Sequence, residues 1–380
     1  MTVYLRRRLR GFAVAIPAAA LAVFSGLPAS AGLAHGAYQQ TNLVSDGAVP
    51  AQHTDSHLKN PWGISGSPSS PFWVSDNATG VTTLYANGNP VFLDPATNPH
   101  QFVVTIPPPL GSLPGTTSSP TGTVFNGTSD FQVAPGKPAR FLFATEDGTI
   151  SGWNPMVDFN NAILKVDNSG GGAGAVYKGL ALGSVGSAHF LYVSNFRAAV
   201  VERYDTNFAF ASAFTDPAVP AGFAPFNVQS DADIGGSNPG WLWVTFAKQN
   251  AEMHDDVAGP GNGFVDLFDT SGNLLRRFAA HGSLNSPWGL AIAPAGFGPF
   301  HGDLLVGNFG DGTINAFNLR KGKFHGQLGD GTGGSITNDS LWGLRFGNGG
   351  AGGPKNTLFF TAGINHEADG LYGSIVSLEN

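Results

Sequence analysis

Acidic, amide and imidazole side chains recur in short polar segments that directly follow apolar runs of this 380-residue sequence. These segments contain Asp76, Asn77, Glu146, Asp147, Asn195, Asn308, Asp311, His366 and Glu367. Carboxylate and amide oxygens are ligands that Ca²⁺ and Mg²⁺ prefer, whereas imidazoles shift the preference toward transition metals. Asp and Asn are also common in tight turns, because they tolerate left-handed backbone and bond to nearby amides. The pattern therefore allows a divalent-cation site or a set of ordinary turns.

A longer polar segment, residues 247–263, contains His254-Asp255-Asp256. Connections of this length between paired strands are uncommon and are often functional. Histidine titrates near neutral pH and commonly transfers protons in enzymes. His254 is therefore one candidate catalytic residue, and His366 is the other. The alternative for the longer segment is a loop that folds over the channel of its own domain, with Asp255 and Asp256 capping its turns.

A repeated set of apolar runs must position these side chains. Residues 286–294 begin with Ser-Pro-Trp-Gly-Leu and are followed by the runs 303–308 and 313–319, which flank Gly-Asp-Gly. Each run has the length of one strand, and Asp-Gly between two such runs is a strong hairpin signal. The same unit begins again at Asn60-Pro61-Trp62-Gly63-Ile64 and at Leu341-Trp342-Gly343-Leu344. A unit of three or four strands that repeats every ~40–50 residues is typical of a propeller blade.

The whole sequence is consistent with an all-β fold of this kind. It contains 54 Gly and 26 Pro, and these residues separate short apolar segments that lack a helical period. We expect one six-bladed β-propeller over residues 40–380, with seven blades as the main alternative. The last blade ends one strand short, so residues 40–45 are predicted to pair beside residues 375–378 and close the ring. Trp62, Trp288 and Trp342 are expected to pack between blades.

The N-terminal residues have the pattern of a secretory signal peptide. Arg6-Arg7-Arg8-Leu9-Arg10 precedes an apolar run, and Ala29-Ser30-Ala31 supplies small residues for cleavage. The run is shorter than the ~20 residues that a membrane-spanning helix needs, and Pro17 interrupts it. We therefore expect a signal peptide over residues 1–31, a linker over 32–39, and a secreted, periplasmic or extracellular mature protein.

Charge and cysteine content narrow the class of partner. The formal net charge is −7, and it becomes −11 once residues 1–31 are removed, because they contain four arginines and no acidic residue. Nucleic acids and anionic membranes need concentrated Lys and Arg, so neither is an expected partner. The absence of cysteine excludes thiolate chemistry of every kind. We expect a monomer that binds a small molecule or an extracellular ligand.

Three segments carry a resemblance to a known family: His254–Val265 (HDDVAGPGNGFV), Ser286–Ala291 (SPWGLA) and Gly307–Phe317 (GNFGDGTINAF). They resemble a family of uncharacterised exported bacterial proteins predicted to be β-propellers. The resemblance implies the fold and export, and it brings no catalytic residues. By analogy of architecture, the calcium-dependent lactonase propellers imply Glu146, Asn195 and Asn308 as ligands of Ca²⁺ or Mg²⁺. Asp76 is added as a fourth candidate ligand, and no other cofactor is expected.

Three functions remain open at this point. The first is binding of a ligand on the face that surrounds the channel mouth, where the turns between second and third strands meet the loops before innermost strands. The second is a metal-dependent hydrolase or lyase, lactonase-like, in which His254 or His366 transfers protons. The third is a non-catalytic module for interactions in the cell envelope.

Overall fold

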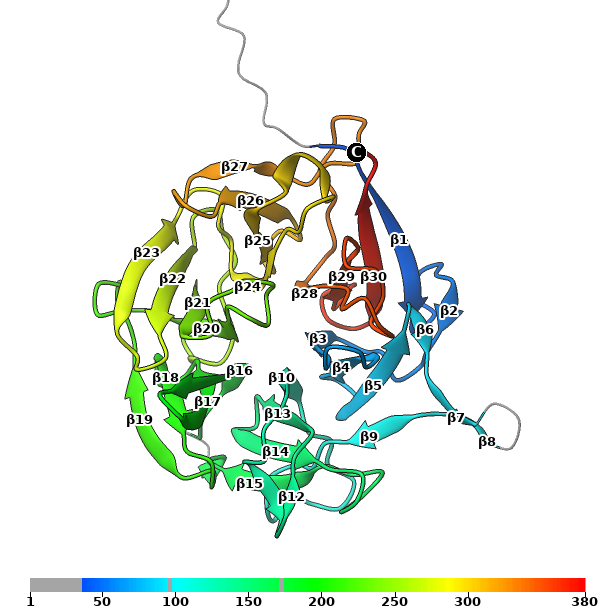
Figure 1. Cartoon of the computed structure of the whole chain (residues 1–380), viewed down its shortest axis with the longest axis vertical. Coiled ribbons are helices and arrows are strands. Elements are labelled where there is room, and N and C mark those ends of the chain that lie inside the picture. Colours follow the sequence, from blue (N-terminus) through cyan, green and yellow to red (C-terminus); the bar gives the residue numbers. More distant parts are fainter. Residues whose placement is uncertain (1–35, 95–97, 171–173, 380) are drawn as a thin grey trace, which may run out of the picture. The chain divides into compact units, whose positions relative to one another are not determined.

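The Trp-Gly repeat forms the innermost strand of a blade, as the unit around Trp288 shows. Strands β24 (Pro287–Ile292), β25 (Asp303–Asn308), β26 (Ile314–Asn318) and β27 (Phe324–Gln327) pair in chain order as one antiparallel sheet. Six such sheets surround a common axis, which confirms the six-bladed β-propeller (Figure 1). The computed structural model describes residues 36–94, 98–170 and 174–379. The predicted signal peptide and the first half of the predicted linker, residues 32–35, lie outside these residues.

The strands of the other blades follow the same plan. Blade one contains β3 (Pro61–Ser65), β4 (Phe72–Asp76), β5 (Val81–Ala86) and β9 (Val103–Thr105), and blade two contains β10 (Pro120–Phe125), β13 (Phe141–Thr145), β14 (Thr149–Trp153) and β15 (Ile163–Asp167). Blade three contains β16 (Tyr177–Val185), β17 (Ala188–Asn195), β18 (Val200–Tyr204) and β19 (Phe210–Phe214). Blade four contains β20 (Phe223–Ser230), β21 (Trp241–Lys248), β22 (Gly263–Asp269) and β23 (Leu274–Ala280).

Blade six is closed by the two ends of the propeller. It contains β28 (Leu341–Phe346), β29 (Leu358–Ala362), β30 (Leu371–Ser377) and β1 (Tyr38–Ser45), which pairs antiparallel with β30. This pairing confirms the predicted closure. The strand begins at Tyr38, inside the segment predicted as a linker, because the Tyr38 ring packs 4.9 Å from the ring of Phe297 and its hydroxyl donates to the Phe297 carbonyl.

The structure also contains short strands and one 3₁₀ helix in addition to the strands of the blades. They are β2 (His53–Thr54), β6 (Asn89–Pro90), β7 (Phe92–Asp94), β8 (Asn98–Gln101), β11 (Gln132–Ala134), β12 (Lys137–Pro138) and the 3₁₀ helix η2 (Gly298–Phe300). β2 adds to β1 as a parallel strand, and β6 continues the edge of β5 beside β9. The outer edge of blade six is therefore partly covered, which limits edge-to-edge pairing with other chains.

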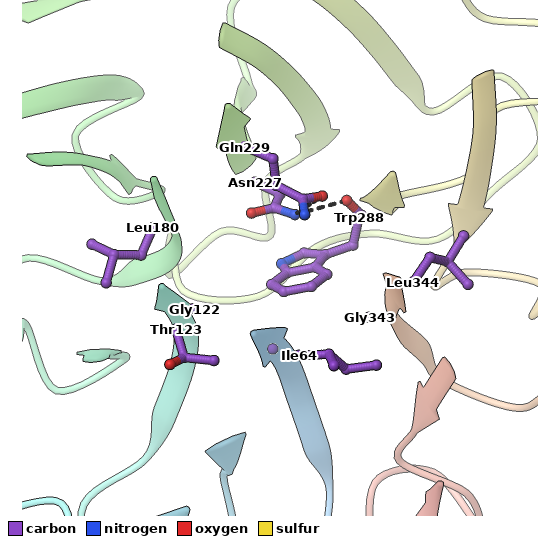
Figure 2. Close-up of a pocket in the computed structure, with 10 residues that line it drawn as sticks. Ile64, Gly122, Thr123, Leu180, Asn227, Gln229, Trp288, Gly343 and Leu344 are labelled. Carbon is purple, nitrogen blue, oxygen red and sulfur yellow. Dashed lines mark hydrogen bonds between the residues drawn. The ribbon is translucent and has the colours of Figure 1, made fainter. Parts of the chain in front are cut away.

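Each innermost strand has an irregularity at the same place, and glycine occupies it in five blades. The ladder register shifts between Pro61 and Ile64 in blade one, and between Pro287 and Leu290 in blade five. A Cβ atom at Gly63 would lie 2.7 Å from the carbonyl oxygen of Thr121 in the next blade. Glycine therefore allows neighbouring innermost strands to approach closely around the axis. Blade four has Asn227 instead, and its side chain donates to the Trp288 carbonyl at 2.9 Å (Figure 2).

The three repeated tryptophans meet on the axis, so the prediction that they pack between blades was wrong. The Trp62 and Trp342 rings stack with centroids 3.4 Å apart, and Trp288 lies edge-on to both, at 6.0 and 5.8 Å. The bulge at each following glycine re-aims these side chains from the sheet face toward the channel. Trp288 and residues of the innermost strands line a cavity of about 20 Å³, enough for roughly one water (Figure 2). These aromatic rings therefore fill the channel between its mouth and this cavity.

Candidate functional site at the channel mouth

Lys178 occupies in blade three the position that tryptophan occupies in blades one, five and six. The register of β16 shifts between Tyr177 and Gly179, so Lys178 precedes the axial glycine as Trp288 precedes Gly289. Its side chain is only 2% exposed, and Nζ lies 5.1 Å from the ring centroid of Trp62. A buried ammonium group needs compensating charge, because burial removes its hydration. The aromatic ring supplies part of that compensation through its electron-rich face.

Two carboxylates supply the rest. Lys178 forms an ion pair with Glu146, which lies in the turn between β13 and β14, and its Nζ is 3.6 Å from Asp255 Oδ1. The second oxygen of Glu146 accepts a hydrogen bond of 2.9 Å from the Asn77 side chain. The lysine therefore holds together a turn of blade two and the long loop of blade four.

That long loop is folded across the mouth. The side chain of Gln249 donates to the Phe196 carbonyl at 2.6 Å, and the amide of Gly259 donates to the Asn285 side chain at 2.6 Å. His254 Nδ1 lies 2.8 Å from Asp255 Oδ1. This hydrogen bond raises the pKa of His254 and, together with the nearby Lys178 charge, lowers the pKa of Asp255. The two side chains therefore form an ion pair over a wider pH range than free groups would.

Asp256 and Glu367 complete the charged groups at the mouth, and burial perturbs both. It raises the pKa of Asp256 to about 6 and that of Glu367 to about 7. Within the part of the chain that the structure describes, Asp256 Oδ2 is buried and has no hydrogen-bond partner. Asn60 donates to Glu367 Oε2 at 2.8 Å, and its own oxygen accepts a hydrogen bond from Trp342 Nε1 at 2.9 Å. The tryptophan stack and the acidic groups are therefore connected.

We call the following set the mouth cluster: Lys178, Glu146, His254, Asp255, Asp256 and Glu367. Lys178 pairs with the carboxylates of Glu146 and Asp255, and Asp255 also pairs with the His254 imidazole. The raised pKa values of Asp256 and Glu367 leave a fraction of each carboxyl group protonated near neutral pH. Groups with separated pKa values in one site can act as proton donors and acceptors at the same pH. The cluster can therefore support acid–base chemistry as well as ligand binding.

A cavity of about 230 Å³ opens beside the cluster. Its lining includes Glu146, Asp147, Arg197 and His254. Arg197 is held by a hydrogen bond of 2.8 Å from Nη1 to the Gly174 carbonyl. Carboxylate, guanidinium and imidazole groups line this cavity. Its volume is below the ~300 Å³ at which sites for drug-sized ligands begin, so it suits a smaller polar molecule.

The structure brings together Glu146 and His254 among the residues predicted from sequence. Asn195 donates to Glu202 in its own blade, and Asn308 donates to Asp311 in its own turn. Asp76 is fully buried in blade one, where burial and then the charge of Asp55 raise its pKa. The structure therefore does not gather the four predicted metal ligands, and metal binding itself stays a prediction. The His366 side chain is 96% exposed and lies outside the cluster.

A different set of donors suits a divalent cation. Ligand atoms of Glu146, His254 and Asp255 lie within 4.8 Å of one another. Two carboxylates and an imidazole are suitable donors in kind. However, the Lys178 ammonium already pairs with the same two carboxylates. A cation bound by these three residues would have to displace the ammonium or tolerate its repulsion.

Sequence reasoning missed Lys178, although a signal for it was present. Lys178-Gly179-Leu180 matches Trp288-Gly289-Leu290 and Trp342-Gly343-Leu344 with lysine in place of tryptophan. A cation at a repeat position that is aromatic in four of the six blades indicates a departure from the architecture, and such departures are expected at functional sites.

Glu367→Gln tests the buried acids through the pH dependence of stability. The folded protein keeps Glu367 protonated up to about pH 7, whereas the unfolded chain releases the proton near its ordinary value of 4.5. The free energy of unfolding therefore falls as pH rises through this window, by up to about 3 kcal/mol. We expect the variant to melt higher than the parent above about pH 7 and equally near the lower end of the window.

The matched control is Glu252→Gln, since Glu252 is exposed on the long loop. Melting curves of all three proteins across the acid-to-neutral range measure the effect. A Glu367→Gln curve parallel to that of the parent would show that this carboxyl is ionised in the folded protein throughout the window.

Comparisons with known proteins agree with the class that the fold defines, the six-bladed β-propeller. A structure of streptogramin B lyase aligns with a TM-score of 0.50 and 12% identity, over 90% of this chain and 97% of that one. A protein of unknown function from Bacteroides thetaiotaomicron aligns with a TM-score of 0.50 and 10% identity, over 90% and 76% of the two chains. At these identities the similarity concerns the fold alone.

The sequence relatives define the family more narrowly. Protein R648 of Acanthamoeba polyphaga mimivirus is 30% identical over 347 residues, which are 88% of this chain and 78% of R648. Protein L690 of the same virus is 30% identical over 88% of this chain and 84% of its own length. The chain belongs to the family of these uncharacterised mimivirus proteins. No protein-family model matches the sequence, and the bacterial membership implied by the resemblance stays a prediction.

Proposed function

We propose that this propeller binds a small polar molecule in the cavity beside the mouth cluster, and that His254, held by Asp255, transfers protons to or from it. One observation carries the proposal: a buried lysine replaces an axial tryptophan and holds Glu146 and Asp255 next to His254. A purely architectural mouth would need no cation at that position, since tryptophan serves there in three other blades.

The chemistry follows from the geometry of the histidine. Asp255 holds His254 Nδ1, so Nε2 is the nitrogen left for the ligand or for a water molecule. A neutral imidazole would take a proton from water that attacks a carbonyl carbon, and the resulting imidazolium would return it to the leaving oxygen. A lactone or another ester-like small molecule fits this sequence, and the class of activity is a hydrolase. A lyase would instead use the same imidazole to take a proton from a carbon atom while a leaving group departs from the adjacent carbon.

His254→Gln tests the catalytic part of the proposal. Lactones, sugars and sugar acids are screened by thermal shift, and opening of the lactones that bind is followed by base uptake at constant pH. We expect the variant to keep binding but to lose about 10²–10⁴-fold in rate, the usual contribution of a positioned acid–base group. The control is His301→Gln, an exposed histidine at the end of η2.

Two results would count against the proposal. If bound lactones are opened at the parental rate by His254→Gln, the proton-transfer role is wrong. If no compound of the three classes raises the melting temperature, small-molecule binding of this kind at the mouth is wrong.

A metal-dependent version of the same activity is the second candidate, because Glu146, His254 and Asp255 offer converging donor atoms. In that version the cation would polarise the carbonyl oxygen, and the three residues would hold it. Elemental analysis of the purified protein, with melting curves with and without a chelator, separates the two versions. Stoichiometric metal whose removal lowers the melting temperature would favour the metal-dependent one.

We also propose that the mature protein acts outside the cytoplasm, secreted, periplasmic or extracellular, after cleavage following Ala31. In the described residues, no helix combines the length and apolar character needed to cross a membrane. The intact mass of the exported protein tests the proposal, since it should correspond to a chain that begins at Gly32.

A further inference from the structure

A second and larger cavity lies at the opposite end of the blades from the mouth cluster. It has a volume of about 570 Å³ and lies between blades four and five. Its lining includes Trp241, Trp243, Leu267, Phe278, Arg276 and Arg320. Strand β21 runs from Trp241 in this cavity to Lys248 at the mouth face, a length of about 23 Å at ~3.3 Å per residue. The two sites are therefore separate.

One wall of the cavity is aromatic. Trp243 is buried, and its ring packs edge-on against Phe278 at a centroid distance of 5.0 Å. Trp241, by contrast, is 36% exposed. The Trp241 indole is partly in contact with water at the rim of an aromatic cavity. A ligand that covers it would remove apolar surface from water, which lowers the free energy of the complex. This wall is therefore suited to a planar apolar group.

Two arginines, Arg276 and Arg320, form another part of the lining. Arg276 is positioned by a hydrogen bond of 2.8 Å from Nη1 to the Arg320 carbonyl and by packing 4.8 Å above the Phe278 ring. Among the described residues, neither Arg276 nor Arg320 has a carboxylate within ion-pair distance, although Lys and Arg form seven ion pairs elsewhere, counting pairs of residues within 4.0 Å. The formal net charge of the protein is −7, so acidic residues outnumber basic ones. Two neighbouring arginines without an acidic partner are therefore unexpected on electrostatic grounds.

The acidic residue in the cavity does not neutralise these arginines. Asp231 Oδ1 accepts a hydrogen bond of 2.8 Å from Trp243 Nε1, and Oδ2 accepts one of 2.8 Å from the amide of Asn238. Gly236 packs against this carboxylate so closely that a side chain there would clash with it. Asp231 therefore has a structural role in shaping the loop between β20 and β21, and the free charge in the cavity is positive.

We propose that this cavity binds an amphipathic aromatic anion, a molecule with a planar apolar body and a carboxylate, sulfonate or phosphate group. The body would lie against Trp241, and the anionic group would be paired with Arg276 and Arg320. Guanidinium groups recognise such oxyanions through paired, charge-assisted hydrogen bonds. The volume is within the range of sites for small organic ligands, about 300–1,000 Å³.

A matched pair of fluorescent probes tests the proposal. Anilinonaphthalene sulfonate carries the aromatic body and the anion, and N-phenylnaphthylamine is the neutral counterpart without the sulfonate. We expect the sulfonate to bind at one saturable site and more tightly than the neutral probe. Trp241→Ala should weaken both probes by about tenfold or more, as expected for a central aromatic contact. Arg276→Gln with Arg320→Gln should weaken only the sulfonate.

Phe210→Ala is the matched control, since Phe210 is a 60% exposed aromatic residue on the outer strand of blade three. Melting curves show whether each variant is folded before it is titrated. Sulfonate affinity that Trp241→Ala leaves unchanged would overturn the site. Equal affinity for both probes, insensitive to the two arginine substitutions, would overturn the anionic character of its ligand.

Discussion

A chain that lacks residues 38–45 is expected to be unfolded at room temperature. These residues form β1, the only antiparallel partner that the described residues provide for the outer edge of β30. The deletion also removes Tyr38, Leu43 and Val44 from the core, where each is at most 8% exposed. Loss of a buried large apolar side chain costs about 2–5 kcal/mol. Three such losses rival the ~5–15 kcal/mol by which a folded domain is stabilised.

Circular dichroism and size-exclusion chromatography would detect the loss of sheet and the expanded chain. The control deletion is residues 112–115, which belong to a largely exposed connection between β9 and β10. We expect that protein to melt cooperatively within a few degrees of the parent. A melting curve without change after deletion of 38–45 would mean that the ring is held closed by contacts between blades one and six alone.

The architecture could be predicted from the sequence because it depends on local, repeated features. Trp-Gly marks three innermost strands, and Asp-Gly precedes the third strand of blades two, five and six, so the count of blades followed from the spacing. Closure followed from the last blade, which was one strand short. These features report backbone geometry directly, since glycine and turn residues are selected by the conformation they must adopt.

The site was harder to predict, because a shift of one residue reverses the direction of a side chain in a strand. Asp76, Asn195 and Asn308 pair with Pro61, Tyr177 and Pro287 at the end of the second strand of their blades. Glu146 comes one position later in its blade, since Thr145 pairs with Pro120. The predicted ligands therefore came from two positions: the last paired residue of the second strand and the residue that follows it. Only the second of these positions, which Glu146 occupies, faces the mouth cluster.

The direction of Lys178 could not be deduced from alternation. In a regular strand Lys178 and Leu180 would point to one face and Gly179 to the other. The bulge after Tyr177 resets this order and directs Lys178 toward the axis, next to Trp62. A register shift of this kind depends on pairing with a second strand, and no single segment of the sequence shows it.

Lys178→Met is expected to destabilise the protein by about 3–5 kcal/mol, the usual cost of removing one partner of a buried ion pair. Methionine preserves the unbranched stem that packs against Trp62 and Phe196. It removes the charge that compensates Glu146, whose side chain is 14% exposed, and Asp255. The loss should therefore come from the uncompensated carboxylates and not from a cavity.

A second substitution separates these two causes. In Lys178→Met/Glu146→Gln, the carboxylate is replaced by an amide that still accepts the hydrogen bond from Asn77. Replacement of both partners of a buried pair is often close to neutral, so most of the lost stability should return. Denaturant unfolding of the parent, both single variants and the double variant gives the coupling free energy, and Lys321→Met, an exposed lysine, is the control.

The same variant distinguishes the two versions of the proposed activity. Removal of the ammonium removes the repulsion against a cation bound by Glu146, His254 and Asp255. At a separation of about 4 Å this repulsion is worth several kcal/mol even with an effective dielectric constant near 20. We therefore expect Lys178→Met to bind Ca²⁺ at least about tenfold more tightly than the parent in calorimetric titrations. Equal affinity would mean that the lysine does not compete with a cation, and the metal-dependent version would then be favoured over the metal-free one.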